Sequence, residues 1–187
     1  MPNTDNPAAE HPSRDRLLND AIEYVAAHGL ADLSLRGLAA AIGTSHRMLI
    51  YHFGSKEGLL TAVAREVEAR QRAALAGLDP AGAGREFWRR LTDESLRANE
   101  KLFFQLYGQA LGGTPGTTEF LDGVVEDWLG PVEALLARYG VPEADRPAHA
   151  RLGLAVARGL LLDLVTTGDR EAVDAAMEKF LALYEKP

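Results

Sequence analysis

Cysteine is absent from the 187-residue chain. Disulfide bonds, metal sites built on thiolates and cysteine nucleophiles are therefore excluded. Long apolar runs are also absent, because Arg158 and Asp163 interrupt the most apolar stretch, "LGLAVARGLLLDLV", which is too short to span a bilayer. The first residues, "MPNTDNPAAEHPSRD", hold no apolar segment typical of a signal peptide. We therefore expect a cytoplasmic protein without a membrane partner.

Enzyme motifs are missing as well. The sequence contains no nucleophile elbow, no phosphate-binding loop and no metal-ligand spacing, and its five histidines are scattered along the chain. We therefore expect no catalytic residues, no cofactor and no metal, and an enzyme is the least favoured interpretation. A helical protein-interaction module without DNA binding remains an alternative.

Negative charge dominates the chain but is unevenly distributed. The net charge is −7, whereas residues 13–77 carry eight Lys/Arg against seven Asp/Glu. Residues 78–187 carry twelve Lys/Arg against eighteen Asp/Glu. Only residues 13–77 would therefore approach a polyanion without strong repulsion.

Helical periodicity runs through the whole chain, and the strand and hairpin signals of β proteins are absent, so the sequence predicts an all-α fold. Ser13, Ser34 and Ser55 are predicted helix N-caps, and Gly29 and Gly43 are predicted helix ends. A third, short helix is expected within "TSHRMLIYHF", and a fourth runs to about residue 77. Further helices are expected near 84–98, 100–111, 117–139, 143–167 and 169–185, about nine in all.

The break at "GLDPAGAG" divides the chain. We expect a disordered arm over 1–12, a helix-turn-helix domain over 13–77 that includes a linking helix over 55–77, and a helical ligand-binding and dimerisation domain over 78–187. Three short helices with a tight turn at 43–45 have the outline of a helix-turn-helix. A third helix anchored by Leu49 and Phe53 would show its other face to a major groove.

The stretch "LSLRGLAAAIGTSHRMLIYHFGSKEGLL" resembles the DNA-binding signature of the TetR-type (tetracycline-repressor-like) transcriptional regulators. The resemblance covers about residues 13–70 and implies a homodimeric DNA-binding protein. By resemblance, the DNA-binding residues are Ser34, Arg36, Ser45, His46, Arg47, Met48, Tyr51, His52 and Lys56. The chain has His46-Arg47 where the family often has Lys-Gly, so the operator sequence does not carry over from relatives.

Several of these residues have a structural alternative. Phe53 is expected in the core, and Tyr51 is expected as a packed ring with its hydroxyl at a phosphate. His52 is also consistent with an ordinary surface histidine, and Lys56 with the solvated first turn of a helix.

The resemblance also implies a ligand cavity and a dimer face in residues 78–187. The candidate cavity walls are Trp88, Phe103, Tyr107 and Trp128, although for any single one of these aromatic side chains plain core is the favoured interpretation. The ligand is an unidentified, largely apolar small molecule.

The last two helices carry the candidate dimer interface. Small or short side chains lie four residues apart at Ala155, Gly159 and Asp163, and an apolar stripe follows at Val173, Met177 and Phe180. A buried Asp163 would need a partner, such as Arg158 of the opposite subunit, and an exposed one would not. The sequence as a whole therefore predicts a ligand-responsive transcriptional regulator, most readily a repressor that binds a pseudo-palindromic operator.

Overall fold

The computed structural model describes residues 12–30, 33–79 and 82–184, and throughout them the fold is helical, with no strand. The predicted arm over 1–12 lies, except for Pro12, outside the described residues. The helices are α1 (Arg14–His28), α2 (Leu35–Ala41), α3 (His46–Phe53), α4 (Lys56–Ala76), α5 (Ala83–Leu91), α6 (Arg97–Leu111), α7 (Glu126–Arg138), α8 (Arg146–Thr167) and α9 (Arg170–Leu181). Short 3₁₀ turns η1 (Glu94–Leu96), η2 (Thr118–Leu121) and η3 (Glu143–Asp145) connect them.

Serine side chains start the first four helices. The hydroxyls of Ser13, Ser34, Ser45 and Ser55 each accept a hydrogen bond from the backbone N–H three residues later, over 2.9–3.3 Å. Each bond satisfies one of the N–H groups that a helix start leaves without a partner. Gly54 ends α3 with φ of 76°, a left-handed conformation that glycine adopts without steric cost. The predicted caps at Ser13, Ser34 and Ser55 are confirmed.

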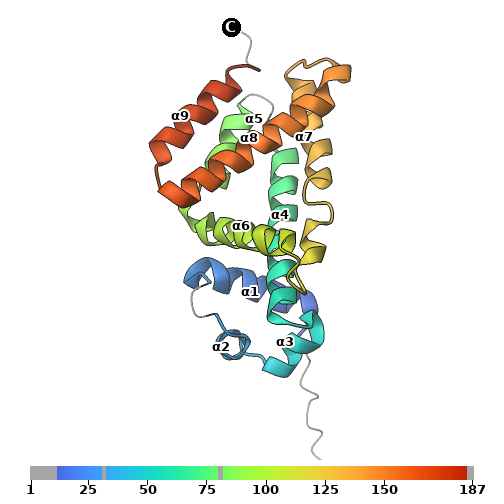
Figure 1. The fold of residues 1–187 in the computed structure, drawn as a ribbon, viewed down its shortest axis with the longest axis vertical. Coiled ribbons are helices and arrows are strands. Elements are labelled where there is room, and N and C mark those ends of the chain that lie inside the picture. Colours follow the sequence, from blue (N-terminus) through green and yellow to red (C-terminus); the bar gives the residue numbers. More distant parts are fainter. Residues whose placement is uncertain (1–11, 31–32, 80–81, 185–187) are drawn as a thin grey trace, which may run out of the picture.

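Helix α4 connects the N-terminal helices to the C-terminal bundle. It starts beside α3 at one end and reaches the bundle of α5, α7, α8 and α9 at the other, while α6 crosses it in between (Figure 1). Leu59 and Val63 of α4 are fully buried with Leu49 of α3, and Leu102 and Leu106 of α6 belong to the same apolar core. The main core therefore crosses the predicted boundary at residue 77.

Two predicted helices are each split in the structure. The helix expected over 84–98 ends at Leu91, because Asp93 accepts hydrogen bonds from the N–H and the hydroxyl of Ser95 and starts η1. The helix expected over 117–139 is broken between η2 and α7. Gly123 lies in this break with φ of 74°, which is incompatible with an uninterrupted helix.

Because one core joins the two predicted domains, we expect them to unfold together. Leu102→Ala should lower the free energy of unfolding by about 2–5 kcal/mol, since it leaves a cavity in the shared core. The matched control Leu111→Ala, on the same helix but 68% exposed, should change it by less than about 0.5 kcal/mol. Denaturant unfolding followed by circular dichroism and by tryptophan fluorescence should give one coincident transition. Two separate transitions would contradict the shared core.

Candidate nucleic-acid interface and internal cavity

The short helix α3 is fixed from one side only. Leu49 is fully buried and Phe53 is nearly so, one turn apart on the face that meets α2 and α4. The guanidinium of Arg14 lies over the Phe53 ring, 5.2 Å from its centre. His46 and Arg47 at the start of α3 are exposed, and Met48 is half-buried. Two anchors therefore leave the remaining face of α3 free.

Tyr51 projects from that free face. Its side chain is 78% exposed, so the expectation of a packed ring is wrong, and its only ring contact among the described residues is the edge of His52 at 4.9 Å. An unpacked ring with a free hydroxyl is available to a partner. His52 is half-buried, and its Nε2 atom is buried without a hydrogen-bond partner in the described part of the chain.

The other predicted contact residues surround α3. Arg36 is exposed on α2, and the hydroxyls of Ser34 and Ser45 are engaged as helix caps. Lys56 is half-buried and its ammonium donates a hydrogen bond to the Leu33 carbonyl. An ammonium has three N–H donors, so Lys56 both joins the start of α4 to the segment before α2 and keeps donors for a second partner.

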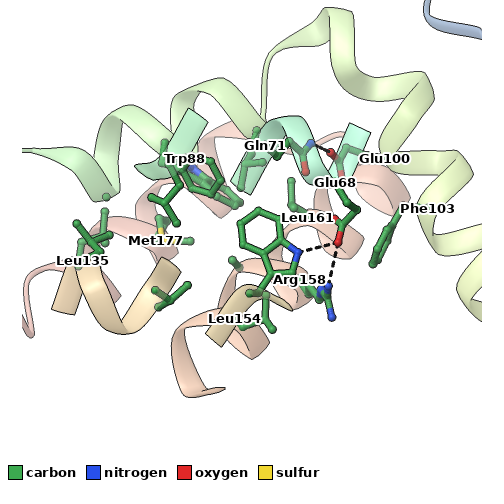
Figure 2. Close-up of a pocket in the computed structure, with 18 of the residues that line it drawn as sticks. Glu68, Gln71, Trp88, Glu100, Phe103, Leu135, Leu154, Arg158, Leu161 and Met177 are labelled. Carbon is green, nitrogen blue, oxygen red and sulfur yellow. Dashed lines mark hydrogen bonds and ion pairs between the residues drawn. The ribbon is translucent and has the colours of Figure 1, made fainter. Parts of the chain in front are cut away.

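A cavity of about 120 Å³ lies at the far end of α4, among α4 to α9 (Figure 2). Three of the four side chains proposed as cavity walls, Trp88, Phe103 and Trp128, line it. Tyr107 does not. Its ring packs against Phe103 and Phe120, at 5.7 and 6.3 Å between ring centres, so Tyr107 belongs to the core and its assignment as a cavity wall is corrected.

Charged side chains that the sequence interpretation missed also line this cavity. One carboxylate oxygen of Glu68 accepts a hydrogen bond from Trp128 Nε1 at 2.7 Å and lies 3.3 Å from the Arg158 guanidinium (Figure 2). Arg158 also donates to the Val124 carbonyl and lies over the Phe103 ring at 5.0 Å. Arg158 is therefore engaged within its own subunit, and Asp163 is exposed on the single chain, so neither side chain needs the other as a partner.

Burial perturbs the acids of the cavity. It raises the pKa of Glu68 above 4.5, although the hydrogen bond from Trp128 and the charges of Arg158 and Arg72 oppose that rise. Burial raises the pKa of Glu100 to about 7, opposed by a 2.9 Å hydrogen bond from the Gln71 amide. The charge of Glu68 adds to the rise for Glu100, and that of Arg158 reduces it. Sequence could have flagged Glu100 only as an acid at an otherwise apolar helical spacing.

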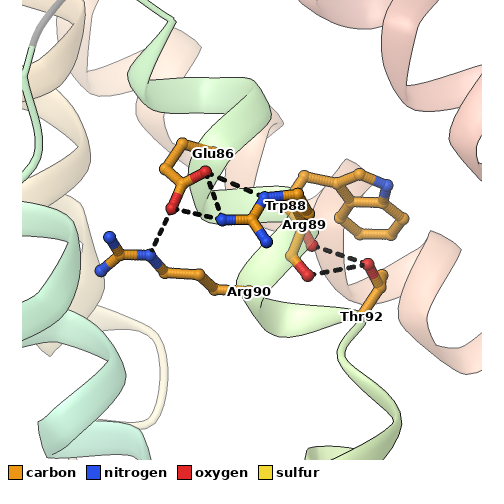
Figure 3. Close-up of polar contacts among 5 residues, drawn as sticks. All are labelled: Glu86, Trp88, Arg89, Arg90 and Thr92. Atoms are coloured by element: carbon orange, nitrogen blue, oxygen red, sulfur yellow. Dashed lines mark hydrogen bonds and ion pairs between the residues drawn. The ribbon is translucent and has the colours of Figure 1, made fainter.

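Helix α5 closes one side of the cavity, carries an ion-pair cluster on its outer face and is bonded to α9 on its inner face. On its outer face Glu86 pairs with Arg89 and Arg90 at 2.7 and 2.8 Å, and these hydrogen bonds lower the pKa of Glu86 (Figure 3). On its inner face Trp88 Nε1 donates to Asp174 of α9 at 2.6 Å. This bond holds α5 to α9, and Arg170 of α9 pairs with the same carboxylate at 2.8 Å.

The predicted dimer residues fall into two groups. Ala155, Gly159 and Asp163 all lie on the exposed lane of α8. Val173 and Met177 do not lie on a free surface, because they are 1% and 4% exposed against Trp88, Leu91 and Leu161 within the chain. Their assignment to a subunit interface is therefore corrected. The apolar stripe of α9 is explained by this internal core, to which the half-buried Phe180 also contributes.

Within residues 12–30, 33–79 and 82–184, no cluster of three His, Cys, Asp or Glu side chains is suited to a metal ion. None of the helices described there combines the length and apolarity that crossing a membrane requires.

Known proteins match this chain in two ways. The family model for bacterial regulatory proteins of the tetR family matches residues 17–63. Over 77 residues the chain is 40% identical to the HTH-type transcriptional regulatory protein RaaS of Mycobacterium tuberculosis, covering 39% of this chain and 36% of that protein. Over 58 residues it is 41% identical to the HTH-type transcriptional repressor AcnR of Corynebacterium glutamicum, covering 31% of each. The matched region thus spans about a third of the length of these relatives.

The fold of the whole chain has a counterpart among solved structures. A transcriptional regulator from Rhodococcus sp. Rha1 superposes with a TM-score of 0.71 at 22% identity, over 92% of this chain and 96% of that one. The sequence match covers α1 to α3 and the start of α4, and the structural match extends the likeness in fold to α9. Residues 17–63 therefore match the model of bacterial regulatory proteins of the tetR family, and the fold of the whole chain is similar to that of a solved transcriptional regulator.

Proposed function

We propose that the protein is a ligand-responsive transcriptional regulator, a repressor that binds a pseudo-palindromic operator as a homodimer in the cytoplasm. The observation that carries this function is α3, whose one face is anchored by Leu49 and Phe53 while His46, Arg47 and Tyr51 stand exposed. A helix presented in this way fits the major groove, which admits one α-helix. The match of AcnR, a repressor, supports the direction of regulation.

Each exposed residue has a proposed role at the duplex. Arg47 lies near the start of α3, where recognition helices contact base edges, and its guanidinium fits the O6 and N7 acceptors of guanine. Arg36, Tyr51 and Lys56 surround it and are proposed to contact phosphates, with the helix starts at Ser34 and Ser45. His46, Met48 and His52 complete the proposed surface. Phosphate contacts would position the protein, and base contacts would select the sequence.

Dimerisation is proposed to use the exposed lane of α8. Leu152 and Leu162 are 48% and 47% exposed and lie on this lane with Ala155 and Gly159. A Cβ built at Gly159 has no heavy atom of the described chain within 4 Å, so a second helix can approach closely there. A symmetric pairing through α8 would place two α3 helices on one duplex, in successive major grooves.

Ligand response is proposed to begin at the cavity. Glu68, Gln71 and Leu75 of α4 form part of its wall, and the opposite end of α4 packs beneath α3. A small molecule that prefers a different position of α4 would favour a dimer whose α3 spacing no longer fits the operator. We therefore treat residues 13–77 as the DNA-binding part and residues 78–187 as the part that senses ligand and dimerises.

Selection of duplexes from a random pool, followed by gel-shift titration of the selected operator, tests DNA binding. If about six phosphates are contacted, log affinity should fall with log salt with a slope near −5. Arg47→Ala should weaken operator binding by roughly 1–3 kcal/mol and relax the preference at one position in each half-site. The control Lys101→Ala removes an exposed cation from α6 and should leave binding unchanged.

Uniform weakening on all duplexes by Arg47→Ala, with the sequence preference intact, would make Arg47 a phosphate contact. Absence of salt-sensitive duplex binding in the unmodified protein would contradict the proposed function and favour a protein-interaction module.

The dimer is tested with matched glycine variants. Gly159→Glu should yield monomers with unchanged helix content, because the new carboxylate has free space within its own subunit but occupies the helix contact beside Asp163. Gly108→Glu, at an equally open and exposed position on α6, should stay dimeric. Sedimentation equilibrium distinguishes the two states. A dimeric Gly159→Glu protein would place the interface elsewhere.

A further inference from the structure

The cavity at the end of α4 combines an apolar wall with a few polar groups. Two tryptophans and three phenylalanines line it, namely Phe87, Trp88, Phe103, Phe104 and Trp128. A cavity on the order of 150 Å³ with an apolar lining holds a ligand the size of benzene, so about 120 Å³ here suits a body of about one ring. The polar side chains of the wall determine which charged or hydrogen-bonding group such a ligand needs.

Two of these polar groups are already compensated. Glu68 accepts hydrogen bonds from Trp128 and Arg158, and Arg72 lies 4.0 Å from the same carboxylate oxygen. Arg158 donates to Glu68 and to the Val124 carbonyl. These bonds connect α4 to α7, to α8 and to the segment that precedes α7. Neither Glu68 nor Arg158 has to find a partner in a ligand.

Glu100, in contrast, has only a neutral hydrogen-bond partner among the described residues. It is 7% exposed, on α6, and Oε1 accepts one hydrogen bond from the neutral Gln71 amide at 2.9 Å (Figure 2). Within the part of the chain that the structure describes, Oε2 accepts no hydrogen bond and the carboxylate joins no ion pair within 4.0 Å. An ionised carboxylate without an ion-pair partner is costly at this degree of burial. Its pKa near 7 reflects that cost.

We propose that Glu100 is the recognition carboxylate for a protonated amine on a ligand with a compact apolar body. This assignment rests on the proposed ligand response and names its ligand class. The ammonium donates to Oε2 and supplies the charge that Glu100 lacks, and the surrounding aromatic faces favour a cation further. A carboxylate ligand is disfavoured, because it would meet both Glu68 and Glu100. The expected ligand, a largely apolar small molecule, is thereby specified as one that carries a protonated amine on an apolar body.

Matched probes of one ring test this assignment. Benzylamine and benzyl alcohol have the same body and differ mainly in charge. Both tryptophans of the chain, Trp88 and Trp128, line the cavity, so intrinsic fluorescence reports binding of either probe. At about pH 8, where Glu100 is mostly ionised, benzylamine should bind about tenfold or more tightly than benzyl alcohol, as expected for a charged hydrogen bond.

The preference should depend on Glu100 itself. Glu100→Gln should remove the preference for benzylamine while benzyl alcohol still binds, whereas Glu126→Gln, which neutralises an exposed acid of α7, should retain it. Lowering the pH to about 6 protonates Glu100 and should shrink the preference in the unmodified protein.

Other charged groups near Glu100 do not explain such a pH response. Glu68 and Arg158 face it across the cavity, and a second hollow that also borders Glu100 is lined by Asp93, Glu94, Arg97 and Arg170. Any response that arises from these groups would persist in Glu100→Gln.

Three results would overturn the assignment. The unmodified protein could bind the two probes equally, or it could bind neither. Alternatively, Glu100→Gln could keep the full preference for benzylamine. The proposed function is judged separately, by operator release in a gel-shift titration. Benzylamine that binds through Glu100 without releasing operator would leave the amine site standing and count against ligand-responsive regulation. Operator release at equal concentrations of benzyl alcohol and benzylamine would support regulation and overturn the role of Glu100.

Discussion

The structure depends on one largely buried carboxylate, that of Glu68, in the middle of helix α4. Glu68 of α4 accepts a hydrogen bond from Trp128 of α7 and pairs with Arg158 of α8, so three helices meet at one charged group. Removing one partner of a buried ion pair costs several kcal/mol, because the other charge stays buried. The position of α4 is therefore tied to the bundle that surrounds the cavity. Its other end, at Leu59 and Val63, packs beneath α3.

This arrangement gives a physical route between the two ends of the molecule. A rigid helix shared by two packed regions cannot move at one end without repacking the other. The acidic excess of residues 78–187 and the near-neutral balance of residues 13–77 fit the same division, because the duplex would meet only the end that carries α3. We infer that ligand occupancy and operator binding are coupled through α4.

Local features were predictable from the sequence, and long-range contacts were not. The serine caps and the anchors Leu49 and Phe53 were predictable because each depends on a few neighbouring residues. The stripe at Val173 and Met177 was misassigned because periodicity shows that a face is buried but not what covers it. The cavity acids escaped notice for a related reason. Glu68 and Glu100 are 32 positions apart in the printed sequence and meet only after α4 and α6 have packed.

The coupling through α4 is tested most directly by the distance between the two α3 helices of the proposed dimer. The chain has no cysteine, so a single cysteine introduced at the exposed Ala40 of α2 gives one spin label per subunit. Electron paramagnetic resonance with the operator bound should report one narrow distribution of distances between the two labels, because the duplex would hold the two α3 helices about 34 Å apart, one helical turn of DNA. In the free protein, Glu68→Gln should shift or broaden that distance distribution, whereas Glu66→Gln, which changes a half-buried acid that pairs only with Arg70 of the same helix among the described residues, should leave it unchanged. Identical distributions for both variants and the unmodified protein, with unchanged operator affinity, would contradict the account.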